Sequence, residues 1–343
     1  MSAYRRRHKY WWIDLSNREL LDTRLCDLEL RITGTLLEKR IEQLYDELAS
    51  RGFRFRPHCW LAEEWFAPHE SPGIAIPFYL AHPRLAKLEA RHMLEVEGGT
   101  VQSCMQLLRH EAGHAFETAY RLSSRLRWKR TFGDARRPYP THYRPKPSSR
   151  SYVLHLDWWY AQCHPTEDFA ETFAIWLRPG FNWRKRYEGW RALKKLEYVD
   201  ELMDDIANRV PPFRSRRQIE PARKLRVTLR EHYARKIARF ASDHPDFYDN
   251  DLRRLFAERD GRRRPSASAF LRKHSRIVRE VVTRWTGESA YTINIVLREM
   301  IVRARELDLR VDRPMRELRL ELAVMVTMQT MNYVHSIDHR IPV

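Results

Sequence analysis

The sequence has few cysteines and no long hydrophobic run. Cys26, Cys59, Cys104 and Cys163 lie far apart and form no Cys-x-x-Cys pair, which excludes a cysteine zinc ribbon and a disulfide framework. We therefore expect reduced thiols and a cytoplasmic protein. No uncharged apolar run approaches the ~20 residues that cross a bilayer, and no export signal is visible, so we expect no membrane association. With 43% hydrophobic residues, the chain is folded rather than disordered or collagen-like.

Acidic residues are also too few to balance the basic ones. Among the 343 residues, 63 Lys and Arg face 45 Asp and Glu, which gives a formal net charge of +18. Residues 121–150 hold ten Lys and Arg against one Asp, a net charge of +9. Such an excess costs stability through self-repulsion and attracts polyanions such as nucleic acid or acidic proteins. Two interpretations stay open, a polyanion-binding surface and a solvated arginine-rich face.

The first third of the chain has the pattern of mixed α and β structure, because apolar residues alternate in some segments and recur at helical spacing in others. Residues 131–151 carry four prolines and cannot form a helix interior. After Pro211 and Pro212 the chain is helical in character. The predicted strands are 27–33, 53–62 and 73–80, and the predicted helices before residue 211 are 35–50, 83–93, 100–122, 166–177 and 191–208.

The most informative motif is His110-Glu111-Ala112-Gly113-His114 within the long predicted helix. Residues four apart share a helix face, so both imidazoles point at one metal ion while Glu111 reaches a metal-bound water. Neutral imidazoles suit zinc, and a catalytic zinc site has three protein ligands and an open position. Chance produces such a motif somewhere in this chain with a probability of roughly a few per cent, so a third ligand is required.

A third ligand is available downstream, in the predicted helix that follows Pro165. Glu167 and Glu171 are four residues apart, so one carboxylate is placed to bind the metal and the other to accept the distal N–H of a ligating histidine. The alternative is that Glu167 and Asp168 only complement the positive end of the helix dipole. Beside the histidine motif we favour the metal site.

The pair HEAGH and EDFAETF resembles the gluzincin metallopeptidases, in which two helices supply His, His and Glu to zinc. The fragments GIAIPFYLAHPRL, LLRHEAGHAFETAY and YAQCHPTEDFAETFAIWL resemble, more closely, the bacterial family named "putative zinc-binding metallopeptidase", loosely over residues 27–183. The resemblance implies that Glu167 is the third ligand and that Glu171 supports a ligating histidine. His164 departs from many relatives, and it either caps the helix or lies exposed to solvent, or it competes as a ligand.

The wider clan includes lethal-factor-like toxins, in which a tyrosine seven residues before the ligand glutamate assists catalysis. That spacing falls on Tyr160 in this sequence, with Tyr152 and Tyr143 as alternatives for the same role. Tyr160 follows two tryptophans, so membership of an aromatic core cluster is the competing interpretation. The mechanism that we expect uses zinc, Glu111 as the general base and a phenol that holds the oxyanion.

The predicted strand before the motif helix is a candidate substrate-binding edge. In peptidases that the sequence resembles, an edge strand in this place pairs with the substrate backbone, which here implicates Gly73, Ala75 and Pro77. Pro77 favours an edge because it lacks the N–H that a central strand donates. A plain core strand is the alternative.

These observations predict an α+β protein with a zincin-like metallopeptidase domain, a small mixed sheet and active-site helices, followed by a mostly helical carboxy-terminal region. We place the domains at 1–210 and 211–343, with a sub-boundary near 261–265. The leading function is zinc-dependent hydrolysis of a protein or peptide substrate, with acidic substrates preferred. The alternatives are a nucleic-acid-associated protein whose zinc site acts on bound proteins, and a scaffold that retains zinc without turnover.

Overall fold

The computed structural model describes residues 10–93, 96–140, 142–143, 146, 148–238, 248–262, 264–288, 290–335 and 341–342. The chain divides into two compact units, each described here by itself. The first unit comprises Met1–Glu89, Val96–His232 and Arg340–Val343, and the second comprises Ala90–Glu95 and Tyr233–His339. The predicted domain boundary falls before residue 211, whereas residues 211–232 belong to the first unit. The assignment of separate domains stays a prediction.

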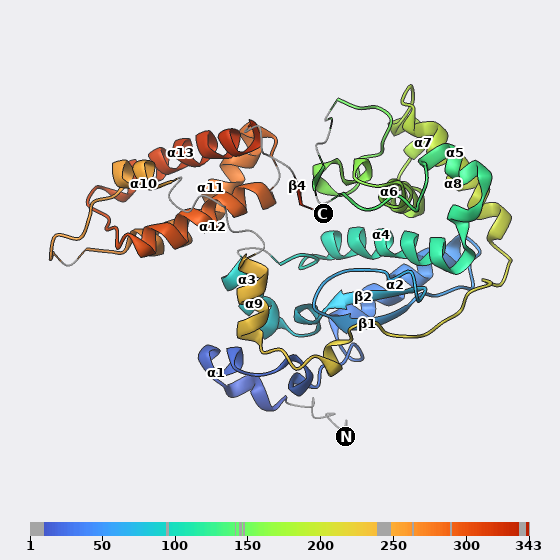
Figure 1. Cartoon of the computed structure of the whole chain (residues 1–343), viewed down its shortest axis with the longest axis horizontal. Coiled ribbons are helices and arrows are strands. Elements are labelled where there is room, and N and C mark those ends of the chain that lie inside the picture. Colours follow the sequence, from blue (N-terminus) through green and yellow to red (C-terminus); the bar gives the residue numbers. More distant parts are fainter. Residues whose placement is uncertain are drawn as a thin grey trace, which may run out of the picture. The chain divides into compact units, whose positions relative to one another are not determined.

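The described helices and strands are shown in Figure 1. The α-helices are α1 (Asn17–Leu21), α2 (Leu36–Ser50), α3 (Pro83–Met93), α4 (Val101–Tyr120), α5 (Leu126–Phe132), α6 (Pro165–Leu177), α7 (Trp183–Arg186), α8 (Ala192–Ile206), α9 (Leu229–Ala238), α10 (Asp249–Leu255), α11 (Ala267–Thr286), α12 (Ala290–Glu306) and α13 (Met315–His335). The strands are β1 (His58–Ala62), β2 (Gly73–Pro77), β3 (His142–Tyr143) and β4 (Ile341–Pro342). The 3-10 helices are η1 (Trp11–Asp14), η2 (Leu25–Leu28), η3 (Phe78–Ala81), η4 (Leu122–Ser124), η5 (Asp157–Gln162) and η6 (Ala222–Lys224).

The sheet of the first unit is small. Strands β1 and β2 pair in parallel, with Trp60 opposite Ala75, and Phe66 forms an antiparallel bridge to Ala75 on the other side of β2. All five residues of β2 are buried. The combination of this small mixed sheet with many helices confirms the α+β class.

Local sequence signals account for most of the helices. Thr35 accepts a hydrogen bond from the N–H of Glu38 and caps α2, whose apolar positions face the core. The strand predicted over 27–33 is wrong, because η2 ends at Leu28 and residues 29–33 form neither helix nor strand. Leu25 and Leu28 are both buried at a spacing of three residues, and the N–H of Leu25 donates to the carbonyl of Val227.

Helix α4 lies between α6 and the β1–β2 pair (Figure 1). The close approach of α4 to α6 requires a glycine, because a Cβ added at Gly113 would lie 2.9 Å from the Cα of Ala170. Arg109 is buried on another side of α4, where it forms two 2.7 Å hydrogen bonds with the carboxylate of Glu47 in α2. Helix α4 is therefore fixed from two directions.

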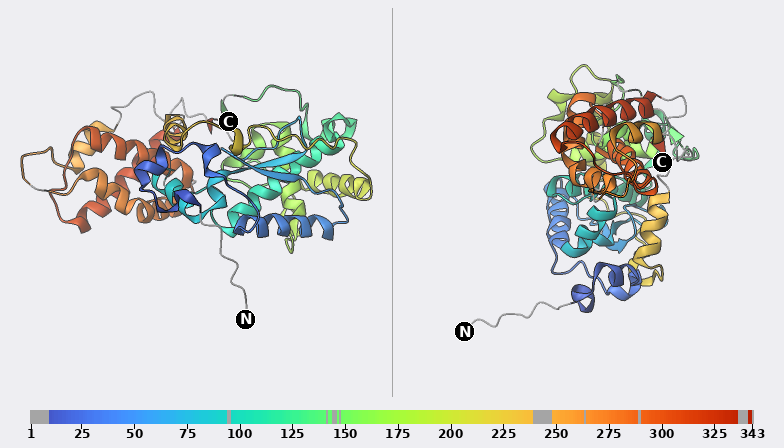
Figure 2. Two further views of the ribbon diagram at one scale, coloured as in Figure 1. Left: turned by 90° about the horizontal axis from the view of Figure 1, so that it is seen from below. Right: turned by 90° about the vertical axis from the view of Figure 1, so that its left-hand side faces the viewer.

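The second unit is helical where it is described. Helices α11, α12 and α13 lie alongside one another in both views of Figure 2 and share an apolar core with α10. The guanidinium of Arg303 pairs with the carboxylate of Asp249 at 2.5 and 2.7 Å. Among the described residues, no helix combines the length and the apolar character needed to cross a membrane.

Candidate metal centre

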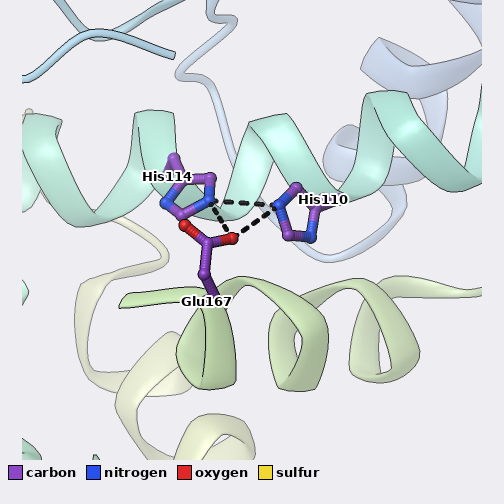
Figure 3. A group of neighbouring side chains, drawn as sticks. All are labelled: His110, His114 and Glu167. Carbon is purple, nitrogen blue, oxygen red and sulfur yellow. Dashed lines mark hydrogen bonds and ion pairs between the residues drawn. The ribbon is translucent and has the colours of Figure 1, made fainter. Parts of the chain in front are cut away.

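His110 and His114 project from one face of α4 toward Glu167 of α6 (Figure 3). The Nε2 atom of each imidazole lies 3.1 Å from Oε2 of Glu167, and the two Nε2 atoms are 3.1 Å apart. Within the described part of the chain, these three side chains form the group whose donor atoms could hold a metal ion. Two helices that are far apart in sequence thus bring two nitrogens and one oxygen to a single point.

The chemistry of this donor set fits zinc. Ligands of a tetrahedral zinc ion at ~2.0–2.1 Å are separated by about 3.3 Å, close to the spacing of these three atoms. Nδ1 of His110 lies 2.9 Å from Oε1 of Glu171, and a carboxylate accepts only, so this nitrogen carries the proton of the neutral ring. Although burial acts in the opposite direction, Glu167 and Glu171 raise the pKa of His110 well above its usual value, so this position favours a positive charge, which a bound metal ion would supply.

Glu171 lies behind the donor group rather than in it. Its Oε1 accepts from His110 and its Oε2 accepts from the backbone N–H of Leu156 at 2.9 Å, so both oxygens are engaged. These bonds fix the orientation and tautomer of the His110 ring. The structure therefore places the two glutamates in the two different positions that the resemblance implies.

His164 caps α6, which confirms the capping role, and it is buried rather than exposed to solvent. Its Nδ1 accepts from the N–H of Thr166 at 3.3 Å, and its Nε2–H donates to the carbonyl of Arg137 at 2.9 Å. Burial lowers the pKa of this imidazole. With both ring nitrogens engaged in this way, His164 does not join the donor group.

Tyr139 is a site residue that the sequence did not reveal. Its Oη donates to Oε1 of Glu167 at 2.6 Å, and its ring stacks on His164 with centroids 3.9 Å apart. The bond leaves Oε2 of Glu167 facing the two imidazoles. Tyr139 lies 28 residues before Glu167 in a proline-rich segment, where no local spacing links the two.

Glu111 lies one residue round α4 from His110 and is 6% exposed. Burial raises the pKa of its carboxyl, while His110 and His114 act in the opposite direction. A carboxylate with a raised pKa beside a metal site is suited to taking a proton from water and returning it at neutral pH. Glu111 is thus a buried carboxyl next to His110 in sequence, and it is not part of the donor group.

The comparison with protein families accords with this site. The sequence model of the family described as "Putative zinc-binding metallo-peptidase" matches residues 18–179. Residues 18–179 are therefore similar to that family. These residues include both site helices, and zinc is the metal that the family description names and that the His-His-Glu group fits. Comparisons with curated proteins and with solved structures found no match.

Tyr160 lies in η5, with its ring centroid 5.9 Å from that of His110. It also packs with Tyr143 and Cys163 in a small cluster, so both interpretations of this residue have a structural counterpart. Burial raises the pKa of its phenol, which keeps it protonated and able to donate. Tyr152 instead holds the ammonium of Lys195 over its ring at 4.1 Å.

The edge of β2 that does not pair with β1 is occupied at its centre by Phe66. The N–H of Ala75 donates to the carbonyl of Phe66 at 2.8 Å, and the carbonyl of Ala75 accepts from the N–H of Phe66 at 3.4 Å. The N–H of Gly73 donates to Ser71, and Pro77 has no N–H. Gly73, Ala75 and Pro77 share one strand, but a peptide pairing along it would have to displace Phe66.

Part of the charge on residues 121–150 is neutralised by acids of helix α8. Arg125 pairs with Asp205 at 2.7 Å and Arg127 pairs with Glu201 at 2.5 Å, whereas Arg136 pairs at 3.1 Å with Asp134, which is already counted in the net charge of +9. Arg144 lies outside the described residues. The net field of this segment is therefore smaller than its charge of +9.

Proposed function

We propose that this protein is a zinc-dependent peptidase of the gluzincin type, with His110, His114 and Glu167 as the zinc ligands. The observation that carries the proposal is the set of three mutual 3.1 Å distances between the donor atoms, contributed by two helices. The family of residues 18–179 supports a protein or peptide substrate.

Each remaining site residue has a proposed part in the reaction. Bound zinc would supply Lewis acidity and lower the pKa of a water molecule toward ~7. Glu111 takes the proton from the attacking water and passes it to the leaving amine. Tyr160 donates a hydrogen bond to the oxyanion, since its phenol stays protonated at neutral pH. Glu171 holds His110 in the tautomer that leaves Nε2 free to bind metal.

The scaffold alternative predicts the same metal content without turnover. The donor group of three side chains supports the peptidase over the scaffold, because structural zinc sites are typically closed by four protein ligands whereas catalytic ones have three. We keep the cytoplasmic location as a prediction, which the four free thiols favour.

Elemental analysis and a peptide-library digest test the proposal. We expect one zinc per parent chain, loss of zinc in His114→Ala, and retained zinc with activity reduced roughly 100- to 10,000-fold in Glu111→Gln. Glu117→Gln is the matched control, because it makes the same substitution on α4 six residues after Glu111. It should leave zinc content and peptide cleavage unchanged. Turnover by Glu111→Gln at the parent rate would contradict the mechanism, and a parent chain with zinc but no cleavage of any peptide would favour the scaffold.

A further inference from the structure

A second concentration of positive charge lies in residues 214–226 of the first unit. This segment carries six basic side chains and one acid, Glu220, and all six basic residues are exposed. Within the described part of the chain, none of the six forms an ion pair. The six are Arg214, Arg216, Arg217, Arg223, Lys224 and Arg226. We call them the 214–226 basic patch.

Four members of the basic patch line a hollow of about 550 Å³, namely Arg216, Arg217, Arg223 and Lys224, and Glu220 lines it as well. Four positive charges and one negative charge therefore lie around one concave surface. Concave surfaces with one sign of charge focus the electrostatic field and concentrate ions of the opposite sign.

Three side chains of the same unit fix the backbone beneath the patch. Trp60 donates its indole N–H to the carbonyl of Ile219 at 2.9 Å, and the hydroxyl of Ser71 donates to the carbonyl of Ser215 at 3.2 Å. The ring Nε2 of His58 donates to the carbonyl of Arg217 at 3.4 Å. The arginines are thus presented from a fixed backbone, which reduces the entropy lost when they bind a ligand.

The composition of the patch favours phosphate as its ligand. Five of the six basic side chains are arginines, whose planar guanidinium group matches a phosphate with two parallel hydrogen bonds. In the described structure of 214–226, no large apolar side chain is exposed, and Ile219 packs beside Trp60. The patch therefore lacks the apolar anchors of a membrane-binding surface and the aromatic platforms that stack on bases.

We propose that the 214–226 basic patch binds the sugar–phosphate backbone of double-stranded nucleic acid, independently of base sequence. Contacts to phosphates position a protein on a duplex without reading its sequence. In Figure 1 the segment passes β1 on the side away from α6, so a bound duplex would leave the metal centre accessible. The proposal goes beyond the peptidase activity and does not depend on it.

Titration of a 20-base-pair DNA duplex by fluorescence anisotropy at 50 to 200 mM salt tests the proposal. The variant is R216Q/R217Q/R223Q/K224Q. Each phosphate contact contributes about −0.9 to the slope of log K against log salt, so loss of four contacts should reduce the slope by about 3 to 4 and the affinity roughly 100- to 1,000-fold. The double variant R223Q/K224Q should show about half of the change in slope.

The control variant is R272Q/K273Q/R284Q/R319Q, which removes three arginines and one lysine at exposed positions of the second unit. Its slope of log K against log salt should differ from that of the parent by no more than the contribution of about one phosphate contact. Equal losses of DNA affinity and of slope in the two quadruple variants would overturn the proposal, because the net charge of the protein alone would then explain binding. The proposal would also be overturned if the parent did not bind DNA, or if the slope were unchanged in the patch variant. It would be overturned equally if the patch bound pyrophosphate, anionic vesicles or an acidic protein while the protein did not bind DNA. Zinc content and melting temperature verify that each variant is folded.

Discussion

Gly113→Ala tests whether the metal centre depends on the close approach of two helices. Alanine is the better helix former, so the substitution should stabilise α4 by about 1 kcal/mol if space were available. The structure leaves no such space, because the new Cβ would lie 2.9 Å from the Cα and 3.2 Å from the carbonyl oxygen of Ala170. The two effects have opposite signs, and their magnitudes decide the outcome.

The steric effect should prevail. Carbon atoms pack at ~3.5–4.0 Å, so the new methyl group is too close to the Cα of Ala170 by about 0.6 Å. The atoms that it meets belong to a backbone and have no rotamer through which to withdraw, and overpacking of this kind costs about 1–3 kcal/mol. We expect a net loss of up to about 2 kcal/mol and a melting temperature lower by up to roughly 8 °C. Separation of the helices should also weaken zinc binding, because Glu167 moves with α6.

Thermal unfolding with and without a chelator, together with competitive zinc titration, measures both effects. Ala119→Gly is the control, since it perturbs the same buried helix without adding a group between α4 and α6. It should lower stability by about 1 kcal/mol or more and keep the zinc affinity of the folded protein. A melting temperature that rises by about 2–4 °C in Gly113→Ala, with unchanged zinc affinity, would refute the reasoning.

Three further predictions concern the surroundings of the site. Glu171→Gln should lower zinc affinity about 10- to 100-fold in a competitive titration, because the charge behind His110 is lost, and an unchanged affinity would contradict its supporting role. Tyr139→Phe removes the hydrogen bond to Glu167 and should lower zinc affinity about 10-fold in the same assay. An unchanged zinc affinity would show that this hydrogen bond does not support the metal site. Charge reversal at Arg136, Arg137 and Lys146 should reduce the preference for acidic over neutral peptides at low salt, and equal selectivity at all salt concentrations would eliminate electrostatic steering.

The helices of the site follow from local sequence, whereas its supporting contacts do not. Caps and apolar spacing locate α4 and α6, and the four-residue intervals put each pair of ligating or supporting side chains on one face. Nothing in these signals reports that Tyr139 reaches Glu167 or that Phe66 covers Ala75. Those contacts depend on how connecting segments return to the core. The strand wrongly predicted at 27–33 has a similar cause, because the backbone just before it, at Leu25 and Cys26, is hydrogen-bonded to a segment some 200 residues later in the chain.

The two ligand helices are separated by the long connection 121–164, and this separation gives the metal a role in chain topology. His114 and Glu167 are 53 residues apart. An ion shared between them acts as a reversible cross-link, and a permanent link that closes a loop of this length restricts the unfolded chain by about 4 kcal/mol. A protease cut within the connection would therefore leave two fragments that zinc still joins. Metal removal would leave only the packing between the two fragments, so the stability of a nicked chain is expected to follow its metal supply.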